Sequence, residues 1–99
     1  MARRSIIWSP RAKIDQFEIL DFFYKKNGNK NYSKKLNSEF KETIKLISRH
    51  TDIGLRTDIQ NVRSIIVGNY SIFYRINEKT IEILTIWDSR QDPHKLAIK

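Results

Sequence analysis

Two arginines and one histidine are among the residues whose chemistry suits a phosphate substrate. Arg63 lies near the start of a predicted strand, Arg90 follows the last predicted strand, and His94 lies after the predicted turn at 88–93. An arginine can stabilise the charge that builds up on a phosphate, and a histidine can act as a general acid or base near neutral pH. Each also has a structural interpretation: Arg63 as a solvated strand-end residue, Arg90 as a support for that turn, and His94 as part of the surface.

The composition limits what kind of protein this can be. The 99 residues suffice for a single domain, over residues 1–99, with one hydrophobic core. The absence of cysteine excludes disulfides, and two histidines are poor material for a metal site, so we expect neither a metal nor another cofactor. No apolar stretch approaches the roughly 20 residues of a membrane span. We therefore expect a cytoplasmic protein that does not contact a membrane.

The charge of the chain indicates its kind of partner. Nineteen Lys and Arg against 11 Asp and Glu give a net charge of +8, with a pI near 9.9. Such a small basic protein predicts a polyanionic or acidic partner. A cluster of lysines surrounds the predicted turn between two helices, and it is either a solvated rim or a contact surface for nucleic acid or a protein target. Its members are Lys25, Lys26, Lys30, Lys34 and Lys35.

The first half of the chain predicts a short strand and two helices. Residues 5–8 are β-branched and aromatic, which is typical of a strand. Ser9 and Pro10 predict a helix start, because serine caps free backbone N–H groups and proline suits the first helical position. Helices are predicted over residues 10–26 and from within 29–33 to about 50. The apolar face of the first helix is predicted to contain Ile14, Phe17, Leu20 and Tyr24, widened by Phe22 and Phe23. That of the second is predicted to contain Tyr32, Leu36, Phe40, Ile44 and Ile47.

The second half predicts a loop over residues 51–61 and then three strands. The strands are expected at 62–67, 70–76 and 80–87, and Gly68-Asn69 between the first two permits the positive φ angles of a hairpin turn. The predicted order is β-α-α-β-β-β. This is an α+β fold in which a helical hairpin packs on one face of an antiparallel sheet.

Both faces of the predicted sheet are partly apolar, although the helices can cover only one of them. Strict alternation places Phe73 and Arg75 on the same face of one strand, and Trp87 on the same face as Ile81 and Ile83. The uncovered face either binds a partner or is covered by the tail at 92–99. Arg75 can also pair with an acidic residue on the neighbouring strand. The candidates for partner binding are Phe73, Arg75, Trp87 and Arg90.

Three segments carry motifs of one known family. Residues 7–12 (IWSPRA) match a strand–W-S-P-x-A–helix start. Residues 69–76 (NYSIFYRI) match a Y-x-I-x-Y-R-I/V strand, and residues 83–93 (ILTIWDSRQDP) match a closing I-L-x-V-x-x-x-R-x-x-P strand and turn. In this order and spacing, they resemble the RelE/ParE superfamily of toxins from type II toxin–antitoxin modules, also known as the plasmid stabilisation protein family. The resemblance covers nearly the whole chain.

The resemblance implies a small basic toxin that a cognate antitoxin neutralises by wrapping an extended segment around it. RelE-like members cleave mRNA on the ribosome, whereas ParE-like members inhibit DNA gyrase. In a RelE-like enzyme, Arg63, Arg90 and His94 would be the catalytic candidates. The closing residues 87–90 resemble ParE-like members more closely.

Departures from the ribonuclease pattern also favour the ParE-like interpretation. Such enzymes often carry a tyrosine or a histidine near the C-terminus as the acid, and here residues 94–99 contain His94 but no tyrosine. Tyr70-Ser71 stand where some members carry a second catalytic arginine. Only Arg56 is basic within 51–61, where some members place a lysine pair ahead of the strands. We therefore expect a ParE-like toxin with gyrase as the implied target and with catalytic residues unknown. The alternatives are a ribosome-dependent mRNA endonuclease and an inactive member that binds its antitoxin and has a regulatory role.

Overall fold

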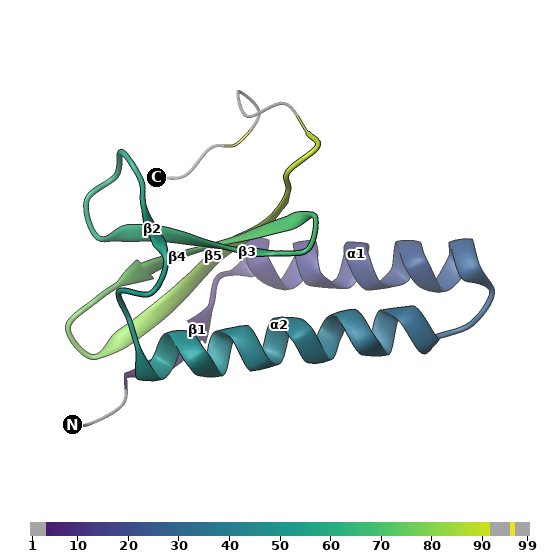
Figure 1. Cartoon of the computed structure of the whole chain (residues 1–99), viewed down its shortest axis with the longest axis horizontal. Coiled ribbons are helices and arrows are strands. Elements are labelled where there is room, and N and C mark those ends of the chain that lie inside the picture. The colour runs from purple at the N-terminus through teal and green to yellow at the C-terminus, as the bar shows by residue number, and fades with distance from the viewer. Residues whose placement is uncertain (1–3, 92–95, 97–99) are drawn as a thin grey trace.

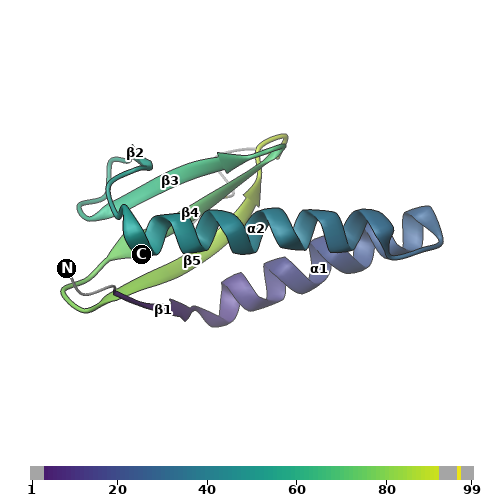
Figure 2. The ribbon, with the colours of Figure 1, turned by 60° about the horizontal axis from the view of Figure 1, so that its bottom comes forward.

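Two helices pack side by side against one face of a five-stranded sheet, and their joined ends project beyond the sheet (Figures 1 and 2). The coordinates are a computed structural model that describes residues 4–91 and residue 96. The elements are β1 (Ser5–Trp8), α1 (Pro10–Asn27), α2 (Asn31–Arg49), β2 (Leu55–Arg56), β3 (Val62–Val67), β4 (Tyr70–Ile76) and β5 (Thr80–Asp88). The predicted α+β architecture is confirmed.

Local capping explains where α1 begins and ends. The Ser9 side chain accepts a hydrogen bond from the backbone N–H of Ala12 at 3.0 Å, and Pro10 occupies the first helical position. At the other end, Gly28 has φ 72°, and its N–H donates to the carbonyl of Tyr24 at 3.0 Å. This left-handed conformation suits glycine and stops the helix. The predicted bounds of 10–26 agree with α1 to within one residue.

The buried face of α2 is close to the predicted one. Leu36, Phe40, Ile44 and Ile47 are all buried, as their spacing indicated. Tyr32 is 42% exposed, and Ser33 is buried instead. The Ser33 hydroxyl satisfies its hydrogen-bonding capacity by donating to the carbonyl of Leu20 on α1, at 2.7 Å.

The prediction for α1 was partly wrong, because this helix has apolar residues on more than one side. Ile14, Phe17 and Tyr24 are 56%, 69% and 44% exposed. Leu20 and Phe23 pack against the core as predicted, together with Ala12 and Ile19. Periodicity alone could not distinguish two apolar stripes on one helix.

The sheet is mixed rather than wholly antiparallel, which corrects the predicted topology. The strand order is β1-β5-β4-β3-β2, and β1 runs parallel to β5 at one edge. The helical hairpin carries the chain from β1 across the sheet face before the three hairpin-linked strands begin, so β1 and β5 can run in the same direction. A second difference is β2, which lies within the predicted loop and pairs with Arg63 and Ser64 at the opposite edge.

A β-bulge in β5 changes which side chains face the helices. Tyr74 pairs with Ile83, but the next pair along the strands is Phe73 with Thr85, so β5 has one extra residue at this point. The consecutive residues Thr85 and Ile86 are both buried as a result. Beyond the bulge, the alternation along β5 is reversed.

The reversal places Trp87 on a different face from the one predicted. Trp87 pairs with Ser71, and residues opposite one another in an antiparallel pair share a face. Trp87 therefore lies on the face away from the helices, whereas Ile81 and Ile83 belong to the core beneath them. Simple alternation fails here because a single inserted residue shifts the phase by one.

Candidate functional site

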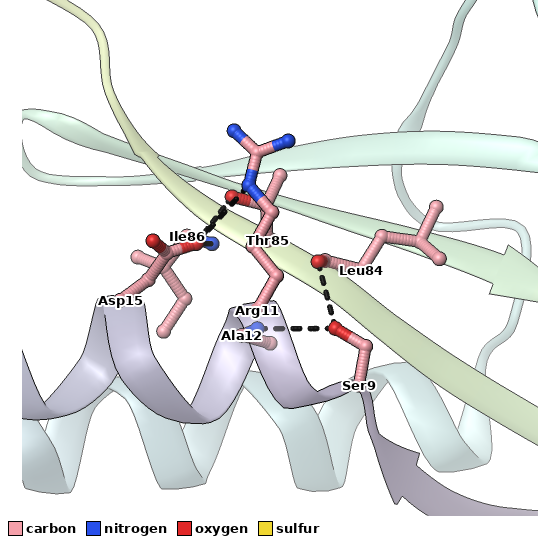
Figure 3. A network of polar contacts seen from close by, with 7 residues as sticks. All are labelled: Ser9, Arg11, Ala12, Asp15, Leu84, Thr85 and Ile86. Atoms are coloured by element: carbon pink, nitrogen blue, oxygen red, sulfur yellow. Dashed lines mark hydrogen bonds and ion pairs between the residues drawn. The ribbon is translucent and has the colours of Figure 1, made fainter. Parts of the chain in front are cut away.

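Beyond the end of β1, the start of α1 contacts the edge of β5. The last residue of β1, Trp8, pairs with Ile83, and the backbone N–H of Ser9 donates to the carbonyl of Ile83 at 3.0 Å. The Ser9 hydroxyl then donates to the carbonyl of Leu84 at 2.9 Å while it caps α1 (Figure 3). One serine thus joins the helix start to the strand edge.

Asp15 continues this connection further along α1. Its Oδ2 accepts hydrogen bonds from the hydroxyl of Thr85 and from the backbone N–H of Ile86, the latter at 3.2 Å (Figure 3). The Nε of Arg11 lies 3.8 Å from the same oxygen. The carboxylate therefore satisfies polar groups at the bulge that no neighbouring strand reaches. Asp15 fixes the position of the last residues of β5 relative to α1.

A cavity of about 370 Å³ opens between α1 and the end of β5. We call it the β5 groove. It combines aromatic and aliphatic walls with three carboxylates and one guanidinium. Its lining residues are Asp15, Glu18, Ile19, Phe22, Tyr70, Ile86, Trp87, Asp88, Arg90 and Gln91.

Arg90 is held in the β5 groove by Asp88. Its Nε lies 3.0 Å from Oδ1 and its Nη2 lies 2.9 Å from Oδ2, so both carboxylate oxygens are engaged. The backbone N–H of Arg90 also donates to Oδ1 at 2.9 Å, which fixes the turn after β5. These hydrogen bonds from Arg90 lower the pKa of the Asp88 carboxyl below its ordinary value. The Arg90 side chain is nevertheless 63% exposed, so its guanidinium is accessible to a binding partner.

Replacing Arg90 with glutamine is expected to raise the pKa of Asp88 toward its ordinary value of 3.8. A lowered pKa stabilises the fold while the carboxylate is ionised, so this contribution is present above the ordinary value and is lost as the pH falls through the folded value. Carboxyl chemical shifts followed by NMR across acid pH measure the change. An unchanged Asp88 titration in Arg90→Gln would contradict the assigned cause.

Tyr70 supplies a neutral phenol to the same groove. Burial raises its pKa above the ordinary value, and the negative charge of Asp88 raises it further. The phenol therefore stays protonated at neutral pH. It is a hydrogen-bonding group rather than a base at that pH.

Arg63 lies at the opposite end of the sheet from Arg90. Its Nη1 donates to the backbone carbonyls of Gly54 and Asp52, at 2.8 and 3.3 Å. Arg63 pairs with Tyr74, whereas the end of β5 next to Arg90 pairs with Tyr70, four residues along β4. That separation corresponds to about 13 Å of strand. The structure does not bring the two arginines together.

Tyr74 works with Arg63 to hold the loop after α2. Its buried hydroxyl donates to the carbonyl of Thr51 and accepts from the N–H of Gly54, both at 2.9 Å. Burial raises the pKa of Tyr74. Five residues thus share one hydrogen-bonded junction, in which Arg63 contacts loop carbonyls.

The other candidates lie on the sheet face away from the helices or outside the described residues. Arg75 contacts Glu82 at 3.3 Å, as the cross-strand interpretation expected. Phe73 lies beside it on β4 and is half-buried. Trp87 is half-buried, with the Arg11 guanidinium 5.9 Å from its ring centre. His94 falls outside the described residues.

Two further findings concern metal and membrane. Among the described residues, no group of three or more His, Asp or Glu side chains is placed to hold a metal ion. Across the same residues, neither helix is apolar enough over a sufficient length to cross a bilayer.

Residues 6–93 match the model for the ParE toxin of the type II toxin–antitoxin system, parDE. The chain belongs to the ParE toxin family. This ParE family member is therefore a toxin of the type II toxin–antitoxin class. A comparison with curated proteins finds no significant match.

Solved structures share the fold of this ParE family member. A chain of the chromosomal ParDE system from P. aeruginosa matches with a TM-score of 0.75 at 22% identity, over 87% of this chain and 96% of the other. The YoeB dimer from Staphylococcus aureus matches with a TM-score of 0.61 at 21% identity, over 87% and 97%. The E. coli DinJ–YafQ complex matches with a TM-score of 0.56 at 12% identity, over 88% and 93%. At these identities the likeness concerns the fold alone.

Sequence reasoning missed three residues that organise this ParE fold. Asp15 lies on a helix turn between apolar residues, and nothing in the spacing indicated that it reaches the bulge in β5. Gly54 and Tyr74 are 20 residues apart, and their contact depends on the whole sheet. No local signal marked Asp15, because it lies six residues after the N-cap and the N–H that it binds belongs to Ile86 of β5.

Proposed function

We propose that this ParE family member inhibits DNA gyrase by binding rather than by cleaving RNA. RNA cleavage of the RelE-like type needs an acid, a base and cations gathered around one phosphate. The observation that supports binding is the placement of the two arginine candidates: Arg63 holds backbone carbonyls at one end of the sheet, and Arg90 lies at the other. The family match to ParE supports the same target.

The β5 groove favours a protein surface over a phosphate as the ligand of Arg90. Three carboxylates, from Asp15, Glu18 and Asp88, line the same cavity and repel a phosphate. Phe22 and Trp87 give the groove apolar walls of the kind that anchor protein partners.

Purified gyrase provides the direct test of this function. Supercoiling of a relaxed plasmid by gyrase should be blocked when the full-length toxin is added, and the antitoxin encoded by the neighbouring gene should restore it. An Arg63→Ala toxin that still folds should inhibit as well as wild type. Undiminished supercoiling at a large excess of toxin would contradict the proposal.

We also propose that the cognate antitoxin covers the sheet face away from the helices. This face exposes Leu55 and Ile66 at 65% each and Ile7 at 48%, and it carries the partner-binding candidates Phe73 and Trp87. Single exposed apolar residues are ordinary, but several on one sheet face indicate an interface. Solved ParDE and DinJ–YafQ complexes with the same fold support an antitoxin as the partner.

Hydrogen–deuterium exchange of the toxin with and without its antitoxin tests this placement. Backbone amides within residues 62–90 should exchange more slowly in the complex. Protection confined to other parts of the chain would show that the antitoxin binds elsewhere.

A further inference from the structure

The end of the helical hairpin carries a charged surface whose lysines all lie outside the β5 groove. This surface, which we call the hairpin tip, comprises residues 22–38 and projects beyond the sheet (Figures 1 and 2). The segment contains five lysines and no Asp or Glu, so it contributes +5 to the net charge of +8. More than half of the excess charge of the protein is therefore gathered at one end.

Most of this charge is not neutralised within the molecule. The Lys25 amine lies 2.9 Å from a carboxylate oxygen of Asp21, the residue that immediately precedes the tip. Lys34 and Lys35 form no ion pair within the part of the chain that the structure describes. A concentrated positive potential in solvent attracts a polyanion over a distance of about one Debye length, roughly 8 to 10 Å.

The start of α2 has lysines where a helix normally favours acidic residues. Its N-cap position is Lys30, whose side chain makes no capping hydrogen bond, and its first turn contains no acidic residue. Lys34 and Lys35 follow immediately. The N-terminus of a helix is the positive end of its dipole, so these lysines are repelled by it. An anion bound at this position would interact favourably both with the lysines and with the positive end of the helix dipole.

Exposed aromatic rings stand among the lysines. Phe22, Tyr24 and Tyr32 are 55%, 44% and 42% exposed. The Lys26 amine lies 5.7 Å from the ring centre of Phe22, and the Lys30 amine lies 5.3 Å from that of Tyr24. Lysines that contact phosphates and rings that stack on bases are the two components of nucleic-acid surfaces. Nucleic acid engages both components, whereas an acidic polypeptide has no bases to stack on the rings.

We infer that the hairpin tip binds the phosphate backbone of nucleic acid. Lys26, Lys30 and Lys34 contact phosphates, and the neighbouring rings of Phe22 and Tyr24 are placed to stack on unpaired bases. The inference does not depend on gyrase as the target, because the lysines that carry it lie outside the β5 groove and only Phe22 belongs to both surfaces. A toxin that carries it would be drawn to any target that works on nucleic acid.

Fluorescence anisotropy with labelled oligonucleotides tests this inference on the full-length protein. Duplex DNA, single-stranded DNA and single-stranded RNA of one sequence are titrated across a series of salt concentrations. The tip variant is Lys26→Gln/Lys30→Gln/Lys34→Gln. The matched control is Lys13→Gln/Lys41→Gln/Lys45→Gln, which changes exposed lysines at the other end of the hairpin and lowers the net charge equally, from +8 to +5 (8 − 3).

Wild-type protein should bind with an affinity that falls steeply with salt. The tip variant should bind about tenfold or more weakly at low salt, and its slope of log affinity against log salt should be shallower by about 2 to 3, roughly one for each lost phosphate contact. The control variant should keep nearly the wild-type slope. Thermal melts of both variants should match wild type, because every substituted side chain is exposed.

Equal losses in the tip and control variants would overturn the inference, because binding would then follow net charge alone. Absence of binding to all three oligonucleotides at low salt would also overturn it. So would displacement of the oligonucleotide by polyglutamate as effectively as by unlabelled DNA, since that would assign the tip to acidic protein. A preference for single strands would support stacking by Phe22 and Tyr24, and a preference for duplex would support contacts to phosphates alone.

Discussion

Replacing Arg90 with alanine is expected to abolish growth arrest by the toxin while leaving the fold intact. Arg90 is the only cation that lines the β5 groove among the described residues, and its side chain is 63% exposed. Its guanidinium bonds only to Asp88 in that part of the chain. An exposed ion pair contributes little to stability. The loss should therefore appear in toxicity rather than in the melting temperature.

Induced expression in a bacterial host, with growth curves and circular dichroism melts of the purified variants, measures both effects. Asp88→Asn keeps the guanidinium and removes its partner, so this variant should remain toxic. Arg49→Ala, which removes an exposed arginine at the end of α2, controls for the loss of one positive charge. Continued growth arrest by Arg90→Ala, or a collapsed melting transition, would contradict a role for Arg90 in binding the target.

Replacing Gly54 with alanine should destabilise the protein more than any change at its other glycines. A Cβ at this position would lie 2.6 Å from the Tyr74 hydroxyl oxygen and 2.8 Å from the backbone carbonyl oxygen of Ser64. The clash would force apart the junction that Tyr74 and Arg63 form with the loop after α2. Overpacking and an unsatisfied buried group together cost about 3 kcal/mol. For a domain of this size the melting temperature should fall by roughly 15 °C.

Gly68→Ala is the matched control for this clash. Gly68 has φ +60°, and an added Cβ would meet no atom within 4 Å. The Gly68→Ala substitution should lower the free energy of unfolding only through the unfavourable backbone conformation, by on the order of 1 kcal/mol. Thermal or urea unfolding of the two variants separates the causes. Equal destabilisation by both would show that the contact between Gly54 and Tyr74 is not the limiting one.

The fold was predictable because its signals are local. Ser9-Pro10 and Gly28 mark the ends of α1 through capping chemistry that needs no distant partner. The three hairpin-linked strands follow from β-branched runs separated by turn residues, and their bounds agree with β3, β4 and β5 to within one residue. These elements could be predicted because residues within or next to each one determine where it begins and ends.

The parts that could not be predicted depend on contacts between distant residues. The bulge in β5 leaves no mark in the alternation of apolar residues, and it decides the face of Trp87. The parallel pairing of β1 with β5 joins residues about 75 positions apart. The junction of Arg63 with Gly54 likewise appears only once the sheet is assembled. A candidate site drawn from residue types therefore contained arginines that lie at opposite ends of the sheet.

The most direct test of the central claim is made on cells in which expression of the toxin is induced. Total RNA is mapped for new 5′ ends while plasmid supercoiling is measured in the same samples. Inhibition of gyrase by binding predicts relaxed plasmid and unchanged mRNA ends. New mRNA ends phased to ribosome positions, with normal supercoiling, would contradict it and would make the protein a ribosome-dependent ribonuclease.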